Sequence, residues 1–211
     1  KENPSRYEEA KRSLLHWVDA SLIEEAYVPL CSLRVSYHRS KEPFPWNKRK
    51  ELFPHTLHEG ERWSKGEFPC AWFHISGKVP EGTDLNRLYI CFRMGGEALL
   101  YDGSGKPLKG FSNGGVAFSS PTNFRLKRYY PLKDLVKNGK VDLWLDGGDN
   151  SAYQPEVGSG VLHEAKLVLQ DPKTVEILSQ VEVLLEEYLH ASLSIEQRDA
   201  LYSGLCKIRD L

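Results

Sequence analysis

The sequence lacks the patterns that mark zinc ribbons, secreted glycoproteins and membrane spans. Its four cysteines are widely spaced and include no C-x-x-C pair, which argues against a zinc ribbon and a redox dithiol. There is no signal-peptide core, no apolar run of membrane-spanning length and no N-x-[ST] sequon with an allowed middle residue. These absences favour a cytoplasmic protein without a membrane partner. The cysteines are Cys31, Cys70, Cys91 and Cys206.

The charges nearly cancel. The chain has 28 basic and 29 acidic residues and a net charge of −1, so a nucleic-acid partner is not expected. A short basic stretch at Asn47–Lys50, with Arg39 and Lys41 before it, is interpreted as a solvated loop. With 211 residues, 40% of them hydrophobic, the chain can form one domain with appendages.

The two ends of the chain are predicted to be helical. In residues 1–28 the apolar positions repeat with a period of 3.6, which indicates a helix with one buried face. In residues 171–211, Asp171-Pro172 is typical of a helix start, and Ser194–Gln197 matches a capping box. Two consecutive amphipathic helices at a chain end are expected to dock on something. The apolar positions of the first helix are Ala10, Leu14, Trp17, Val18 and Leu22.

Between the helical ends, residues 29–170 predict a β-sandwich domain. Short segments alternate apolar and polar residues and are separated by Gly, Pro and Asn turns such as Asp102–Gly105. Because no helical period intervenes, the fold class is mainly β: an antiparallel β-sandwich, jelly-roll and galactose-binding-domain-like, with an N-terminal helix and a C-terminal helical extension. The expected strands are Leu30–His38, Cys70–Val79, Leu88–Met94, Glu97–Tyr101, Lys106–Gly110, Phe124–Tyr130, Val141–Leu145 and Leu162–Leu169.

A series of motifs follows in a characteristic order. Trp72-Phe73 precedes Val79-Pro80, the Glu97–Tyr101 segment leads into Gly105–Gly110, and Arg128–Leu132 comes further on. This order resembles the N-terminal β-sandwich domain of α-mannosidases of glycoside hydrolase family 38, over about residues 56–211. The resemblance implies a parent enzyme that is a zinc-dependent, retaining glycosidase acting on α-linked mannose. It also implies that the partner is the chain's own catalytic domain, which is absent from this chain and toward which the extension at residues 171–211 leads. The β-sandwich domain would then support the catalytic barrel, its cleft or homo-oligomer contacts.

The catalytic signature of that family is not found in this chain. The family's first metal ligands stand in a His-x-Asp motif, and none of the seven histidines has Asp two residues later. No catalytic or metal-binding residue is therefore assigned, and zinc is implied only for the absent catalytic domain. The chain on its own is expected not to be an enzyme.

Three aromatic residues are candidates for contacting carbohydrate. Trp46, Trp63 and Tyr101 are expected on loops or at a hairpin, where a ring can stack on the apolar face of a pyranose. They carry the alternative hypothesis of a self-sufficient carbohydrate-binding module for mannose-containing oligosaccharides. Trp72 is instead expected in the core because its strand alternates cleanly. The pair His55 and His58, and the acidic residues Glu59, Glu61 and Glu67, are interpreted as ordinary loop residues.

Overall fold

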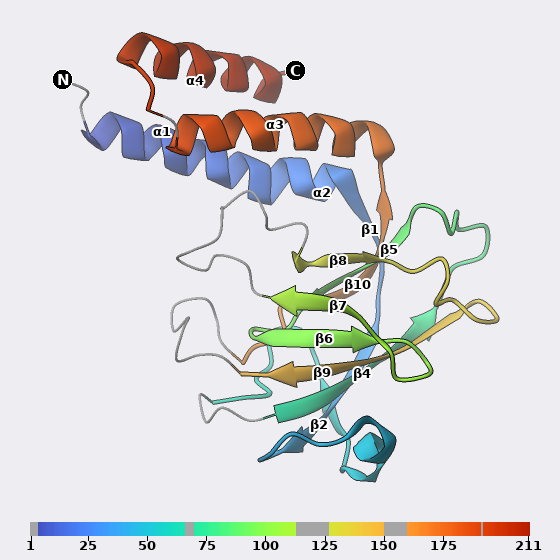
Figure 1. Ribbon diagram of the computed structural model, residues 1–211. Helices are drawn as coiled ribbons and strands as arrows, with labels where there is room; N and C mark the ends of the chain where they lie inside the picture. The colour runs from blue at the N-terminus through green and yellow to red at the C-terminus, as the bar shows by residue number, and fades with distance from the viewer. Residues whose placement is uncertain (1–3, 66–69, 113–126, 150–159, 191) are drawn as a thin grey trace.

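The protein consists of two stacked antiparallel sheets and a layer of helices on one side of them (Figure 1). The computed structural model describes residues 4–65, 70–112, 127–149, 160–190 and 192–211. Within these ranges the predicted mainly β, antiparallel sandwich with helices at both ends is confirmed. The described part of the expected strand at Phe124–Tyr130 contains a strand at Tyr129–Pro131, and the first three residues of that expectation lie within 113–126, outside the described residues.

The larger sheet has six strands in the order β3-β2-β4-β9-β6-β7, and the smaller has four in the order β1-β10-β5-β8. The larger sheet contains β2 (Arg34–Ser40), β3 (His55–Leu57), β4 (Cys70–Lys78), β6 (Glu97–Tyr101), β7 (Pro107–Ser112) and β9 (Lys140–Gly148). The smaller sheet contains β1 (Tyr27–Ser32), β5 (Leu88–Arg93), β8 (Tyr129–Pro131) and β10 (Glu164–Gln170).

The main hydrophobic core fills the space between the two sheets. Leu88, Ile90 and Phe92 alternate along β5 and are fully buried there, as their period of two predicts. Phe73 and Ile75 of β4 face them from the other sheet. The alternate side chains of each strand therefore point away from this core, to the outer face of their sheet.

The expected single strand at Leu30–His38 is wrong, because this stretch forms two strands in different sheets. β1 pairs with β10 and β2 pairs with β3 and β4, so the chain changes sheet at Leu33. The Leu33 backbone N–H donates to the Ala165 carbonyl at 2.8 Å, and its side chain lies in the core. The crossing needs no turn residue, because the Leu33 N–H is hydrogen-bonded and the Leu33 side chain is buried inside the sandwich.

A helical layer covers the outer face of the four-stranded sheet (Figure 1). Cys91, Tyr129 and Val168 point outward from that sheet and pack with Leu14 and Leu178 in a second hydrophobic cluster. Helices from both ends of the chain form this helical layer. They are α1 (Pro4–Trp17), a π-helical turn (Val18–Leu22), α2 (Ile23–Ala26), α3 (Pro172–His190) and α4 (Ile195–Arg209). α4 packs on α1 and α3 on the side away from the sheets (Figure 1).

The two predicted helix starts in the C-terminal extension are confirmed. The Asp171 carboxylate accepts from the Thr174 backbone N–H at 2.9 Å at the start of α3. Ser194 and Gln197 form the capping box of α4, each side chain accepting from the other residue's backbone N–H. Both caps satisfy backbone donors that a helix start otherwise leaves unpaired.

Candidate functional site

The outer face of the six-stranded sheet carries a row of aromatic side chains. The strand register places His74 of β4 beside Trp144 of β9, and Trp144 beside Tyr101 of β6. The imidazole of His74 stacks on the Trp144 indole with ring centroids 4.5 Å apart. Trp72 lies one step along the same face of β4, since it is two residues from His74. Alternation along three neighbouring strands is therefore enough to assemble the row.

Residues 41–54 fold over this row and bury much of it. The segment contains a 3₁₀ helix, η2 (Trp46–Glu51), and is held by two hydrogen bonds to the sheet. The Trp72 indole N–H donates to the Phe44 carbonyl at 2.8 Å, and His38 Nδ1 lies 3.0 Å from the Leu52 carbonyl. Only 2% of Trp72 and 8% of Trp144 stay exposed as a result.

Trp46 anchors the covering segment to the hairpin of β6 and β7. Its ring stacks on Tyr101 with centroids 5.3 Å apart, and the Arg49 guanidinium lies 3.4 Å from its centroid. Arg49 also lies over Trp144 at 4.7 Å, so one cation contacts two indoles. The Nε of Arg49 is buried and has no hydrogen-bond partner within the described part of the chain.

A groove of about 880 Å³ opens beside these rings, and we call it the aromatic groove. Its size falls in the range of small-molecule sites in proteins. One wall is η2, another is the turn between β6 and β7, and the third is the loop between β8 and β9. Its lining consists of Trp46, Arg49, Lys50, Tyr101–Ser104, Leu108, Tyr130, Pro131, Lys133–Leu135, Lys137, Lys140 and Asp142–Trp144.

Two carboxylates in the aromatic groove have protein partners. Asp102 accepts from the backbone N–H groups of Ser104 and Lys106, both at 2.9 Å, and from the Ser104 hydroxyl at 2.6 Å. These bonds, led by the Ser104 hydroxyl, lower the pKa of Asp102 below its ordinary value. Asp142 lies 2.9 Å from Nε2 of His74. Both carboxylates thus contribute to the local structure of the groove wall.

The structure brings two of the three predicted aromatic residues together and separates the third. Trp46 and Tyr101 lie in contact on the rim of the aromatic groove. Trp63 is different, because its ring is 2% exposed, donates its N–H to the Met94 carbonyl and packs on Phe73 in the core. The expectation that Trp63 presents its ring on the surface is wrong, and it offers no face to a sugar.

Trp144 and Arg49 also belong to this site, although neither was among its predicted residues. The alternation of Val141, Leu143 and Leu145 into the core already requires Trp144 to point to the outer face. Arg49 belongs to the basic stretch that was interpreted as a solvated loop, and only its packing on two indoles shows otherwise. Trp72 is buried as predicted, although it lies on the outer face under Trp46 and not between the sheets.

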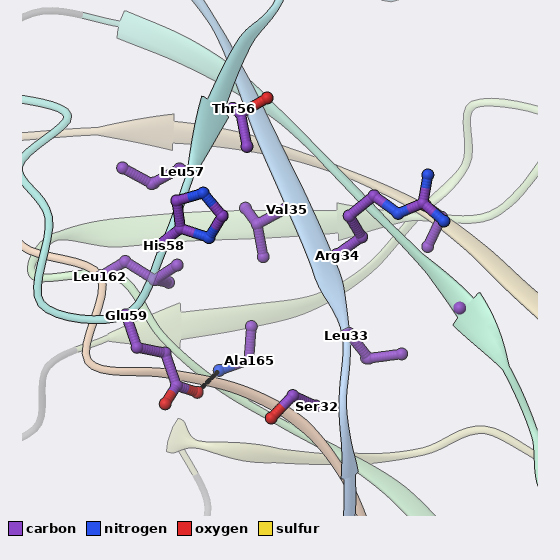
Figure 2. Close-up of a pocket in the computed structure, with 12 residues that line it drawn as sticks. Ser32, Leu33, Arg34, Val35, Thr56, Leu57, His58, Glu59, Leu162 and Ala165 are labelled. Atoms are coloured by element: carbon purple, nitrogen blue, oxygen red, sulfur yellow. Dashed lines mark hydrogen bonds between the residues drawn. The ribbon is translucent and has the colours of Figure 1, made fainter.

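A second cavity, of about 500 Å³, lies at the edge of the sandwich beside β2 and β3 (Figure 2). Figure 2 shows Glu59 directed at Ala165, whose backbone N–H it accepts at 3.1 Å. Glu61 similarly accepts from the His58 backbone N–H at 2.8 Å. Both acidic residues therefore have structural roles, while Glu67 lies outside the described residues.

The described residues do not provide a donor set for zinc. No group of three or more His, Cys, Asp or Glu side chains among them could hold a metal ion, and His55 stacks on Tyr37 with centroids 5.2 Å apart. The zinc implied for the parent enzyme is thus not assigned to any residue in the described ranges. None of the helices in those ranges is both long and apolar enough to cross a membrane.

Comparison with known proteins identifies the sandwich. Residues 28–176 match the protein-family model described as "Alpha-mannosidase, jelly roll domain". The match begins in β1, includes every described strand that follows, and ends in the first turns of α3. A search of the curated proteins finds no match.

Proposed function

The chain belongs to the alpha-mannosidase jelly roll domain family, and from this premise we propose that it is the non-catalytic N-terminal domain of a family 38 α-mannosidase. The parent enzyme would release α-linked mannose from glycans. Its zinc ion and its retaining chemistry would belong to the catalytic domain. The family match over both sheets is the observation that carries this proposal. A cytoplasmic setting agrees with four free cysteines.

We assign the helical layer the role of facing the chain's own catalytic domain. Side chains of this layer include apolar groups that the sandwich does not cover: Ile177 is 44% exposed, Val183 66% and Ile195 45%. Apolar groups on neighbouring helices are suited to burial against a further domain. The domain would in this way brace the barrel, shape its cleft or support oligomer contacts.

An activity assay tests the non-catalytic role. The purified chain with added zinc is expected to leave an aryl α-mannoside intact, because the bond-breaking groups lie elsewhere. The parent is tested by reading the frame that follows Leu211, where a His-x-Asp motif is expected. Zinc-dependent turnover by the chain alone would contradict the proposal.

The aromatic groove favours a second candidate function, contact with a saccharide. Tyr101, Trp46 and Trp144 line the same groove, and aromatic rings bind the apolar faces of pyranoses. The groove also supplies charged side chains that can hydrogen-bond sugar hydroxyls, including Arg49 and Asp142. The second candidate function is therefore that of a carbohydrate-binding module whose binding site is the aromatic groove.

Titration with mannose oligosaccharides tests the saccharide contact. Replacing Tyr101 by Leu keeps apolar volume but removes the ring face, so binding should weaken about ten-fold or more. Phe53→Leu is the matched control, because Phe53 is 75% exposed and does not line the groove. Equal affinity of Y101L and the unaltered chain would exclude Tyr101 from the contact.

A further inference from the structure

The aromatic groove has an excess of positive charge, although the whole chain has a net charge of only −1. Five basic and three acidic side chains line it, so two positive charges are not balanced within the lining. The basic residues come from separate elements that surround one space. They are Arg49 and Lys50 of η2, Lys133 and Lys137 of the loop before β9, and Lys140 of β9.

Two of the three carboxylates of the groove already have other partners, and the third is Asp134. Asp102 is occupied by the N–H and O–H groups of its own turn, and Asp142 lies against His74. Among the described residues, none of the four lysines forms an ion pair. Their ammonium groups therefore remain available to a ligand.

A tight turn places two of the lysines opposite each other. Lys137 and Lys140 exchange both backbone hydrogen bonds, at 2.9 and 3.0 Å, around Asn138 and Gly139. Both central residues have positive φ, 52° and 66°, as this kind of turn requires. Directly opposed residues on paired strands have neighbouring side chains, and like charges in that position repel. An anion bound between the two lysines would relieve this repulsion.

The turn between β6 and β7 lies close to the same lysines. A Cβ built on Gly103 would lie 3.8 Å from Nζ of Lys137, so this ammonium reaches across to the turn that follows Tyr101. Positive charge and an aromatic ring are in this way adjacent in one groove. A ligand with an anionic group and an apolar face could contact both at once.

We propose that the aromatic groove binds a saccharide carrying a negatively charged group such as a phosphate ester. The inference rests on the proposed saccharide contact and specifies its ligand class. The ring of Tyr101 contacts the apolar face of the sugar, and Lys133, Lys137 and Lys140 surround the phosphate. Lysine binds phosphate as a point charge through its three N–H donors.

Calorimetric titration of the full chain with mannose, mannose 6-phosphate and inorganic phosphate tests the proposal. Mannose 6-phosphate is expected to bind at least about ten-fold more tightly than mannose at low salt, since charge-assisted hydrogen bonds are the stronger ones. The advantage should shrink as the ionic strength rises to about 0.5 M, because salt screens exposed charges.

Two double variants separate the groove from overall charge. Lys133→Gln with Lys137→Gln should remove most of the preference for the phosphorylated sugar. Lys173→Gln with Lys207→Gln removes the same charge from exposed positions in the helical layer and should leave the preference unchanged. Thermal melts of both variants establish that they fold.

The outcomes distinguish this inference from the saccharide contact beneath it. Equal affinity for mannose and mannose 6-phosphate would overturn the inference and leave the saccharide contact in place. Inorganic phosphate binding as tightly as mannose 6-phosphate, or an equal loss in both double variants, would also overturn the inference. If neither mannose, the mannose oligosaccharides nor mannose 6-phosphate binds, both proposals are overturned.

Discussion

At the scale of single residues, Gly105 shows how the turn between β6 and β7 admits the Trp46 indole. Its φ is +91°, which side chains disfavour, and a Cβ at this position would lie 2.7 Å from the indole nitrogen. Gly105→Ala should therefore lower the free energy of unfolding by about 1–3 kcal/mol. Urea denaturation with tryptophan fluorescence measures the change.

Gly103→Ala is the matched control for Gly105, since it alters the same turn. A Cβ there meets nothing closer than 3.8 Å, so its cost should be within about 0.5 kcal/mol. Equal destabilisation by the two substitutions would show that turn flexibility matters and that the Trp46 contact does not.

His38 makes the stability of the covering segment depend on pH. Burial lowers the pKa of His38 below its ordinary value of 6.5, His55 and His74 add to this when charged, and the Leu52 carbonyl opposes it. Below about pH 6.5 the unfolded chain binds a proton at this position before the folded chain does. The free energy of unfolding should therefore decrease as the pH is lowered, by up to about 1.4 kcal/mol per pH unit for this group.

The variant His38→Gln isolates this effect from the other titrating groups. Glutamine keeps a polar side chain of similar size but takes up no proton. Denaturation between about pH 7 and pH 5 should show a shallower loss of stability in H38Q than in the unaltered chain. Parallel pH dependence in the two proteins would mean that His38 does not contribute.

At the scale of elements, the capping box of α4 is a local device with a measurable value. Ser194→Ala removes the acceptor of the Gln197 backbone N–H and should cost about 0.5–2 kcal/mol. Ser203 lies exposed within the same helix, and Ser203→Ala should be neutral or slightly stabilising because alanine favours helices. Hydrogen exchange of the α4 amides resolves both effects, and equal protection in the two variants would contradict the role of the cap.

Strands and helices with one buried face were predictable from the sequence. The point at which the chain leaves one sheet and joins the other was not. The alternation of Leu88, Ile90 and Phe92 identified β5 and its core face because each side chain has a fixed side. The break at Leu33 could not be seen, since an apolar residue fits the pattern both of one long strand and of a crossing between sheets. The turn at Asp102–Gly105 was predicted because its chemistry is local.

The candidate site was predictable only in part, for a related reason. Tyr101 and Trp46 come from segments far apart in sequence, and local patterns do not report that a loop will fold over an outer sheet face. Trp63 was misplaced because a loop position suggests exposure, whereas its burial depends on the N–H bond to Met94. Trp144 could have been found by applying the strand period to both faces of β9.

At the scale of the whole molecule, the four-stranded sheet belongs to both hydrophobic clusters. Ile90 and Phe92 of β5 face the core between the sheets, while Cys91 between them faces the helical layer. The helices and the sandwich thus share strands, so neither cluster can lose its packing without disturbing the other. We infer that the described parts of the chain unfold as one cooperative unit.

Leu185→Ala tests this cooperativity from the side of the helices. Leu185 is 1% exposed in α3, so the substitution should cost about 2–5 kcal/mol, whereas Val183→Ala at a position 66% exposed should cost less than about 0.5 kcal/mol. Far-ultraviolet circular dichroism follows the helices, and tryptophan fluorescence is dominated by the four indoles of the sandwich. In a cooperative protein both signals of L185A shift to the same lower midpoint. A helical signal lost before the fluorescence changes would show that the helical layer unfolds on its own and that the sandwich is stable without it.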